Sequence, residues 1–128
     1  MSELLVDTDI LIDIANNDIV AKNRIQQESQ TKQLAISTIT VMELTVGSRN
    51  KSEVRSLKHF LRQFQIVRIN PKISDEAVNL IENYSLSHGL KIPDALIAAT
   101  AIDYDIPLLS KNQRDYRFIA KLNLLSYP

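Results

Sequence analysis

The sequence contains no cysteine, and its only glycines are Gly47 and Gly89. Without cysteine, a disulfide framework, a thiolate nucleophile and cysteine-bound zinc are all excluded. Two glycines are too few for a glycine-rich phosphate-binding loop. The histidines, His59 and His88, have no partner at metal-ligand spacing, and we expect them on the surface or at a helix end. Chemistry based on sulfur or histidine is therefore not indicated.

Long hydrophobic runs are also missing. No apolar run approaches the roughly 20 residues needed to span a bilayer, and Ser2 and Glu3 follow Met1 where a signal peptide would be basic and then apolar. We therefore expect a cytoplasmic protein with no membrane partner. Lys plus Arg and Asp plus Glu both number 15. Net charge thus gives no long-range attraction to nucleic acid, although a basic patch can still lie beside an acidic pocket.

The length and composition are those of a globular domain. The chain has 128 residues, 45% hydrophobic and 23% charged, with no repeat, linker or low-complexity segment. This size suits one domain that buries a sizeable core. We predict a single domain over residues 1–128.

Short apolar runs alternate with longer segments of helical period. Buried strands are expected at 4–6, 34–36, 66–69, 107–109 and 122–125. Helices are expected near Asp9 and at 38–47, 51–64, 74–86 and 93–102, the last apolar almost all round and therefore deeply buried. Continuous apolar strands separated by helices are typical of a parallel sheet covered on both faces. The predicted fold is a three-layer α/β/α sandwich with a central parallel sheet of about five strands.

Four acidic residues follow the predicted strands. Asp7 ends the first strand, Glu43 lies in the helix after the second, Asp94 is in the first turn of the apolar helix, and Asp115 follows the "PLLS" strand. Taken singly, Asp7 is equally well explained as a helix cap and Asp94 as a complement to the helix dipole. Glu43 stands in an otherwise apolar segment, where Glu is rarely buried without a partner. Because ligands bind beyond the carboxyl ends of parallel strands, we expect all four carboxylates at one edge of the sheet.

Four carboxylates in one crevice repel each other. Either some keep a proton, with a raised pKa, or a cation lies between them. Oxygen ligands without Cys or His favour Mg²⁺ or Mn²⁺. Such an ion orients a phosphodiester, lowers the pKa of an attacking water and stabilises the leaving oxygen. The acids therefore predict metal-dependent phosphodiester hydrolysis.

The motifs "VDTDILID", "TVMELTVG", "GLKIPDALIAATA" and "PLLSKNQRDYRFI", in this order, resemble the PIN-domain family, particularly the VapC-type toxin ribonucleases of prokaryotic toxin–antitoxin pairs. The resemblance covers nearly the whole chain. It implies a PIN-like fold and an endoribonuclease that uses Mg²⁺ or Mn²⁺. It also implies a homodimer that is silenced by a cognate antitoxin protein. The number of metal ions, the RNA and the dimer surface stay open.

The same resemblance assigns roles to individual residues. Asp7, Glu43, Asp94 and Asp115 match the acids that hold the metal and catalyse the reaction in the family. Thr8, Ser110 and Asn112 match supporting positions, with Ser110 standing where many relatives have threonine. Asp9 lies where relatives vary. We interpret it as a helix-cap or supporting residue, and Asp13 as serving the helix and its surface.

Several cations are candidates for RNA contacts. Residues near the acidic motifs suit phosphates close to the metal: Arg49, Lys91, Lys111 and Arg114. A second set falls at helical spacing opposite the apolar face of the 51–64 helix: Lys51, Arg55, Lys58 and Arg62. This stripe indicates either a solvated helix face, a track for phosphates or a site for an acidic partner. Tyr116 and Phe118 are candidates for stacking on bases, although core packing is the simpler use of Phe118.

Two other functions fit parts of the sequence. Asp7-Thr8-Asp9 after an apolar strand also resembles the start of haloacid-dehalogenase-type phosphatases. Those enzymes need a lysine and a later acidic pair, for which Asp103 and Asp105 are the only candidates, and both precede a strand. The other alternative is a catalytically inactive PIN-like module that binds RNA or protein. Loss of one of the four acids would favour it, and all four are present.

Overall fold

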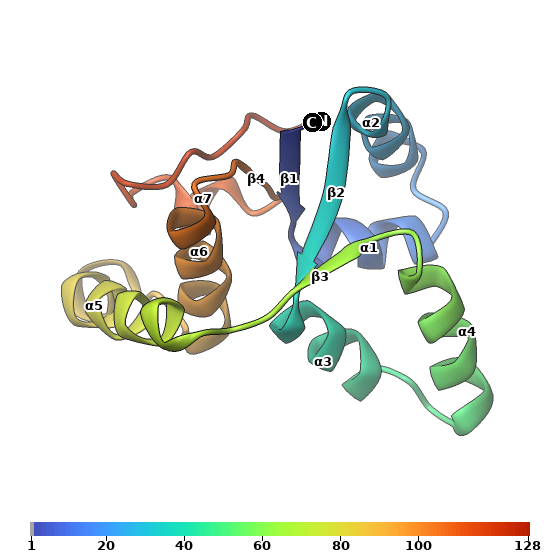
Figure 1. Cartoon of the computed structure of the whole chain (residues 1–128), viewed down its shortest axis with the longest axis horizontal. Helices are drawn as coiled ribbons and strands as arrows, with labels where there is room; N and C mark the ends of the chain where they lie inside the picture. Colours follow the sequence, from blue (N-terminus) through green and yellow to red (C-terminus); the bar gives the residue numbers. More distant parts are fainter. Residues whose placement is uncertain (1) are drawn as a thin grey trace.

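Four parallel strands form the central sheet of the computed structural model, which describes residues 2–128. They are β1 (Ser2–Val6), β2 (Lys32–Ser37), β3 (Gln65–Val67) and β4 (Leu108–Leu109). Their order across the sheet is β3-β2-β1-β4 (Figure 1). The two longest strands, β1 and β2, therefore lie in the middle, and their carboxyl ends point to the same edge.

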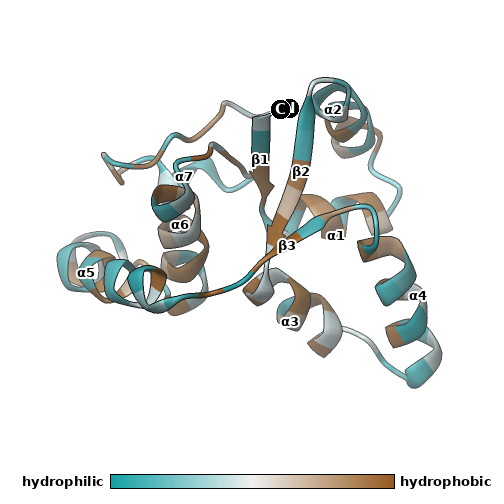
Figure 2. Cartoon of the chain, in the orientation of Figure 1, coloured by the Kyte–Doolittle hydropathy of each residue, from teal (hydrophilic) through white to brown (hydrophobic). Residues whose placement is uncertain are grey.

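The central strands are apolar at successive positions because helices cover both of their faces. Leu4, Leu5 and Val6 of β1 are fully buried, and so are Ala35 and Ile36 of β2. Alternate residues belong to separate clusters, since Leu5 packs on one side of the sheet while Leu4 and Val6 pack on the other. Hydrophobic residues accordingly dominate the middle of the sheet in Figure 2.

Helices α5 (Pro71–His88), α6 (Ile92–Tyr104) and α7 (Gln113–Tyr116) cover one face of the sheet. Helices α1 (Thr8–Ala15), α2 (Ile19–Ser29) and α4 (Lys51–Leu61) cover the other. Helix α3 (Thr38–Val46) lies beyond the carboxyl end of β2 (Figure 1). The predicted three-layer α/β/α architecture with a parallel sheet is confirmed. Buried residues fill α6 from Ala95 and Ile97 to Ala101, as its apolar sequence predicts.

The sheet has four strands where the sequence predicts about five. In the segment 122–125, Leu124 forms only an isolated parallel bridge with Leu108. Leu108 donates its N–H to Asn123 and accepts one from Leu125. Because β4 is only two residues long, it offers too little backbone for a longer ladder.

Local capping explains where the helices depart from their predicted ends. Helix α5 begins at Pro71, three residues early, because the Asn70 side chain accepts the Ile73 N–H at 2.8 Å. It ends at Gly89, whose φ of 69° is a left-handed conformation that glycine adopts at little cost. Helix α2 has no counterpart in the predicted elements, since Ala21 and Ile25 are its only buried apolar residues.

No helix within residues 2–128 combines the length and the apolar character that crossing a membrane requires.

Candidate active site

Asp7 lies at the point where β1 ends and α1 begins. Its backbone N–H donates to the Leu109 carbonyl at 2.9 Å, which extends the pairing of β1 with β4 by one residue. Its carboxylate accepts the Thr8 N–H at 2.9 Å and caps α1. The side chain is only 4% exposed. Both interpretations of Asp7 therefore fit, because the carboxylate that caps the helix is also the most deeply buried acid at this edge.

Ser110 fixes the second oxygen of Asp7. The pairing of Asp7 with Leu109 brings the next residue, Ser110, beside the aspartate, and its buried hydroxyl donates to Asp7 Oδ2 at 2.7 Å. The same hydroxyl lies 3.3 Å from Asp9 Oδ2 and accepts the Asn112 N–H at 3.0 Å. Ser110 and Asn112 thus lie beside the acids, as the sequence predicts. The contact from Asn112 comes from its backbone.

Asp9 belongs to this group of acids, a placement that the sequence left open. Its Oδ2 accepts the Asn112 N–H at 3.0 Å, while its Oδ1 is buried and has no hydrogen-bond partner among the described residues. Burial raises the pKa of Asp9, and backbone donors at Lys111 and Asn112 partly offset this effect. The sequence did contain a signal for this placement. Asp9 lies only two residues after Asp7, in the first turn of α1.

Glu43 reaches the site from α3. Its Oε1 lies 2.7 Å from the Thr8 hydroxyl, which also lies 2.9 Å from the Thr40 hydroxyl. A carboxylate is the stronger acceptor, so Thr8 donates to Glu43 and accepts from Thr40. Glu43 itself is exposed, and the expectation that it is buried is wrong. Two apolar neighbours also face outward, with Met42 49% exposed and Val46 85% exposed, whereas Val41 and Leu44 pack against the core.

Asp94 and Asp115 meet at the amino end of α6. Asp94 is half-buried in the first turn of α6, and Asp115 is exposed in α7. Both line a small pocket of about 70 Å³ together with His88, Gly89, Leu90 and Lys91. The histidines lie as expected: His59 is exposed on α4, and His88 is exposed at the end of α5.

Tyr116 is a site residue whose role the sequence did not indicate. Its side chain is completely buried, so the expectation that it stacks on RNA bases is wrong. Its hydroxyl donates to Asp94 Oδ1 at 3.2 Å. Burial and the nearby carboxylates of Asp7 and Asp94 hold the pKa of Tyr116 above its ordinary value, so the proton stays in place. Phe118 packs against His88 and Tyr84, as its use in the core predicts.

The carboxylates act on one another electrostatically. Burial and the charge of Asp9 together raise the pKa of Asp7 to about 7, against the opposing hydrogen bonds from Ser110 and Thr8. Burial also raises the pKa of Asp94, and the carboxylates of Asp115 and Glu43 add to this shift. All four predicted acids and Asp9 therefore form one coupled group at the carboxyl edge of the sheet.

The donor chemistry of this group fits a hard divalent cation. It offers carboxylate and hydroxyl oxygens, and the buried Asp9 Oδ1 accepts no hydrogen bond among the described residues. The pKa of Asp7 is raised by its burial and by the charge of Asp9. As the side chains stand, no three acidic or histidine groups within residues 2–128 lie close enough together to hold a metal ion. Binding would therefore require rotation of exposed side chains such as those of Glu43 and Asp115.

The cations predicted near the acids have different surroundings. Arg49 pairs with Glu53 at 2.8 Å, and Lys111 pairs with Asp13 at 3.0 Å. Lys91 precedes α6 and lines the pocket of Asp94 and Asp115. Arg114 is exposed in α7, next to Asp115. Of the four predicted phosphate contacts, Lys91 and Arg114 form no ion pair within the described residues.

Comparison with known proteins gives the family. Residues 4–122 match the family model described as "PIN domain". Ribonuclease VapC10 of Mycobacterium tuberculosis (strain CDC 1551 / Oshkosh) is 30% identical over 110 residues, which cover 85% of this chain and 82% of that protein. The chain belongs to the PIN-domain family, in its VapC type. Ribonuclease VapC of Rickettsia bellii is 29% identical over 133 residues, covering 98% and 96% of the two chains.

Solved structures share the fold. A toxin–antitoxin complex from Klebsiella pneumoniae aligns with a TM-score of 0.80 and 32% identity, covering 96% of each chain. VapBC2 from Rickettsia felis, bound to a DNA fragment from its promoter, aligns with a TM-score of 0.83 and 25% identity over 98% of this chain and 99% of that one.

A phosphatase of the haloacid-dehalogenase type has no support in this PIN-domain chain. Its candidate acidic pair, Asp103 and Asp105, lies at the carboxyl end of α6, where Asp105 is the cap residue. Asp94 and the other site acids lie at the opposite end of that helix. Asp103 and Asp105 therefore lie about two and a half and three helical turns away from Asp94, at about 5.4 Å per turn.

Removing the Tyr116 hydroxyl tests whether it positions Asp94. We expect Tyr116→Phe to slow RNA cleavage by about tenfold, the usual effect of losing a hydrogen-bond partner of a metal-site ligand. The phenyl ring keeps the buried packing, so the melting temperature should fall only slightly. Cleavage rates and thermal melts measure both effects, with Tyr104→Phe on the exposed side of α6 as the control. A rate within twofold of wild type would rule out the positioning role.

Proposed function

We propose that the chain is a metal-dependent endoribonuclease that hydrolyses RNA phosphodiester bonds at the carboxyl edge of its sheet. The observation that carries this proposal is that Asp7 and Asp9 share contacts with one Ser110 hydroxyl in a PIN-domain site, where their charges repel each other. Ribonucleases of this family are typically metal-dependent. A cation that relieves this repulsion also suits phosphate chemistry.

Asp7, Glu43, Asp94 and Asp115 are the residues proposed to hold Mg²⁺ or Mn²⁺. When bound, such an ion supplies charge stabilisation at the phosphate and lowers the pKa of the attacking water. These acids are the proposed catalytic residues. Asp9 lies in contact range of the same cluster through Ser110, and it adds negative charge that favours cation binding.

Hydroxyl groups of the chain are proposed to orient the acids. Thr8 holds Glu43, Ser110 holds Asp7, and Tyr116 holds Asp94, each through one hydrogen bond of 2.7 to 3.2 Å. Each of these three carboxylates keeps further lone pairs that can bind a cation. Fixed carboxylates reduce the reorganisation required in the transition state, which is the main contribution that a preorganised site makes.

Phosphates next to the scissile bond are proposed to contact the cations that surround the acids. Lys91 lines the pocket of Asp94 and Asp115, and Arg114 is exposed next to Asp115. Arg49 and Lys111 are held by Glu53 and Asp13 in exposed ion pairs. Such pairs are worth little in water, so both side chains can exchange a carboxylate for a phosphate.

The proposed partners follow from the relatives. Related solved structures are described as toxin–antitoxin complexes, and we propose a cognate antitoxin for this chain, which would then be the toxin of a type II pair. A homodimer is proposed from the family resemblance alone. The whole chain, residues 1–128, is proposed to work as one PIN-like domain.

Cleavage of an RNA pool by the purified protein tests the proposed activity. We expect cutting with Mg²⁺ or Mn²⁺, none with a chelator, and none by Asp7→Asn purified in parallel, which controls for a contaminating nuclease. Millimolar metal should also raise the melting temperature of the wild type through binding to the folded state. A folded protein that binds metal and RNA but cuts nothing would favour the inactive binding module instead.

A further inference from the structure

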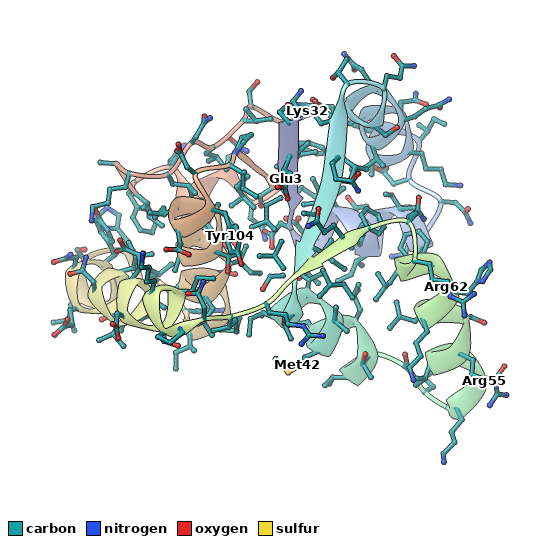
Figure 3. All side chains as sticks on the ribbon, viewed as in Figure 1. Glu3, Lys32, Met42, Arg55, Arg62 and Tyr104 are labelled. Atoms are coloured by element: carbon teal, nitrogen blue, oxygen red, sulfur yellow. The ribbon has the colours of Figure 1, made fainter. Side chains whose placement is uncertain are left out.

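Helix α4 carries a row of cations on its outer side. Lys51, Arg55, Lys58 and Arg62 are all exposed, and none of them takes part in an ion pair within the described residues. Figure 3 shows Arg55 and Arg62 on α4, on the side away from the sheet. We call these four residues the α4 stripe. They gather positive charge on one face of a chain whose net charge is zero.

The geometry of α4 makes the stripe straight. Its residues are spaced four, three and four apart, so each lies about one turn above the last, and the row is roughly 16 Å long. The opposite side of the helix is apolar, where Leu57, Leu61 and Phe64 pack toward the core. The stripe is therefore held rigidly by a helix that is anchored along its inner face.

Helix stability explains only part of the stripe. Lys58 lies in the last turn of α4, where a cation complements the helix dipole, but Lys51 lies at the opposite, positive end. Like charges three and four residues apart also destabilise a helix. The acid in the first turn of α4, Glu53, is turned toward Arg49, which it binds at 2.8 Å. A solvated face selected for helix stability would instead mix both signs.

The position of the stripe links it to the acids. Helix α3 carries Glu43 and ends at Val46, and α4 begins with Lys51, the first residue of the stripe. Figure 1 shows the two helices joined at the end of the molecule to which the central strands point. Phe60 and Phe64, in α4 and its C-terminal turn, pack inward, so His59 is the exposed ring beside the stripe among the residues of α4.

We propose that the α4 stripe binds the backbone phosphates of a single-stranded RNA segment that flanks the cleaved bond. This inference rests on the proposed ribonuclease function and adds a second contact region to it. A row of exposed cations binds backbone phosphates regardless of base sequence. The stripe would therefore raise the affinity for long RNA and leave the choice of cleavage site to the pocket around the acids.

RNA binding by the uncleaving Asp94→Asn protein tests the stripe. The probe is a fluorescein-labelled single-stranded RNA, measured by anisotropy at several salt concentrations. Three versions are compared. The first replaces all four stripe residues with Gln, and the second exchanges Lys and Arg at the same positions (K51R, R55K, K58R and R62K). The third replaces four cations outside α4 with Gln: Lys22, Lys72, Arg117 and Lys121.

The salt dependence separates the outcomes. Each phosphate contact to a single strand contributes about 0.7 to the slope of log affinity against log salt, so the stripe variant should lose about 2 to 3. The Lys/Arg exchange should keep the slope, and the scattered variant should lose clearly less. Equal losses in the stripe and scattered variants would overturn the proposal, as would no RNA binding by the Asp94→Asn protein or a slope that the stripe variant leaves unchanged. That last result would point to an acidic protein partner.

This test is independent of catalysis. The wild-type chain could cut no RNA while the stripe variant still shows a smaller salt slope than the Asp94→Asn protein. The proposed ribonuclease function would then fail, and the proposed RNA binding by the α4 stripe would be kept. If the wild type cuts RNA and the stripe variant binds RNA as tightly as before, only the proposed RNA binding by the α4 stripe is rejected.

Discussion

Asp94→Asn should lower the rate of RNA cleavage by about a thousandfold or more while the chain stays folded. The substitution keeps the shape of the side chain but removes one negative charge from the coupled group of acids. A metal-held phosphate gains several kcal/mol in the transition state, and each 1.36 kcal/mol is a factor of ten in rate. Single-turnover cleavage with excess enzyme measures this loss without a contribution from product release.

The matched control for Asp94→Asn is Asp105→Asn on the same helix. Asp105 is exposed and caps the far end of α6 with a φ of 52°, a conformation that Asn tolerates well. We expect this variant to cut RNA at the wild-type rate. If Asp94→Asn cuts at that rate too, Asp94 is no part of the active site.

Sequence patterns predicted the elements whose causes are local or periodic. The apolar runs of β1 and β2 and the all-apolar sequence of α6 led directly to the parallel sheet and its buried helix. The predicted helix at 74–86 was too short at both ends, because its caps, Asn70 and Gly89, lie outside that range. The weak apolar stripe of α2 gave no such signal, since Ala21 and Ile25 are its only buried apolar residues.

The acids were predicted because topology brings strand ends together, whereas their surroundings depend on contacts far apart in the sequence. Ser110 reaches Asp7 across 103 residues, and Tyr116 reaches Asp94 across 22. Periodicity contains no information about either hydrogen bond. For the same reason the burial of Tyr116 and the exposure of Glu43 were predicted wrongly, because each depends on which neighbouring element covers the side chain.

The metal-free protein should lose stability as the pH rises from about 4 to about 7. The pKa of Asp7 rises from its ordinary value of 3.8 to about 7 in the folded chain. Between these values the folded state holds a proton that the unfolded state has released, so the free energy of unfolding falls with increasing pH. The shift corresponds to a loss on the order of 4 kcal/mol. Burial raises the pKa of Asp9 and Asp94 in the same direction.

Urea unfolding at a series of pH values, with chelator present, measures this effect in the wild type and in Asp7→Asn. The Asn side chain can accept the Thr8 N–H through Oδ1 and donate through Nδ2 to the Ser110 hydroxyl. It therefore keeps the local structure without the titration. Most of the pH dependence should disappear, and the variant should be more stable than the wild type at pH 8. Asp75→Asn, at an exposed position of α5, should unfold as the wild type does.

Adding millimolar Mg²⁺ at pH 8 then tests whether metal binding offsets the instability caused by the ionised Asp7. A cation replaces the proton as the partner of the Asp7 carboxylate, so it should restore stability to the wild type but give much less to Asp7→Asn. The buried charge that destabilises the metal-free protein is then the source of its metal affinity. A wild type whose metal-free stability is constant or increases between pH 4 and 7 would contradict it, because Asp7 would then be ionised without cost.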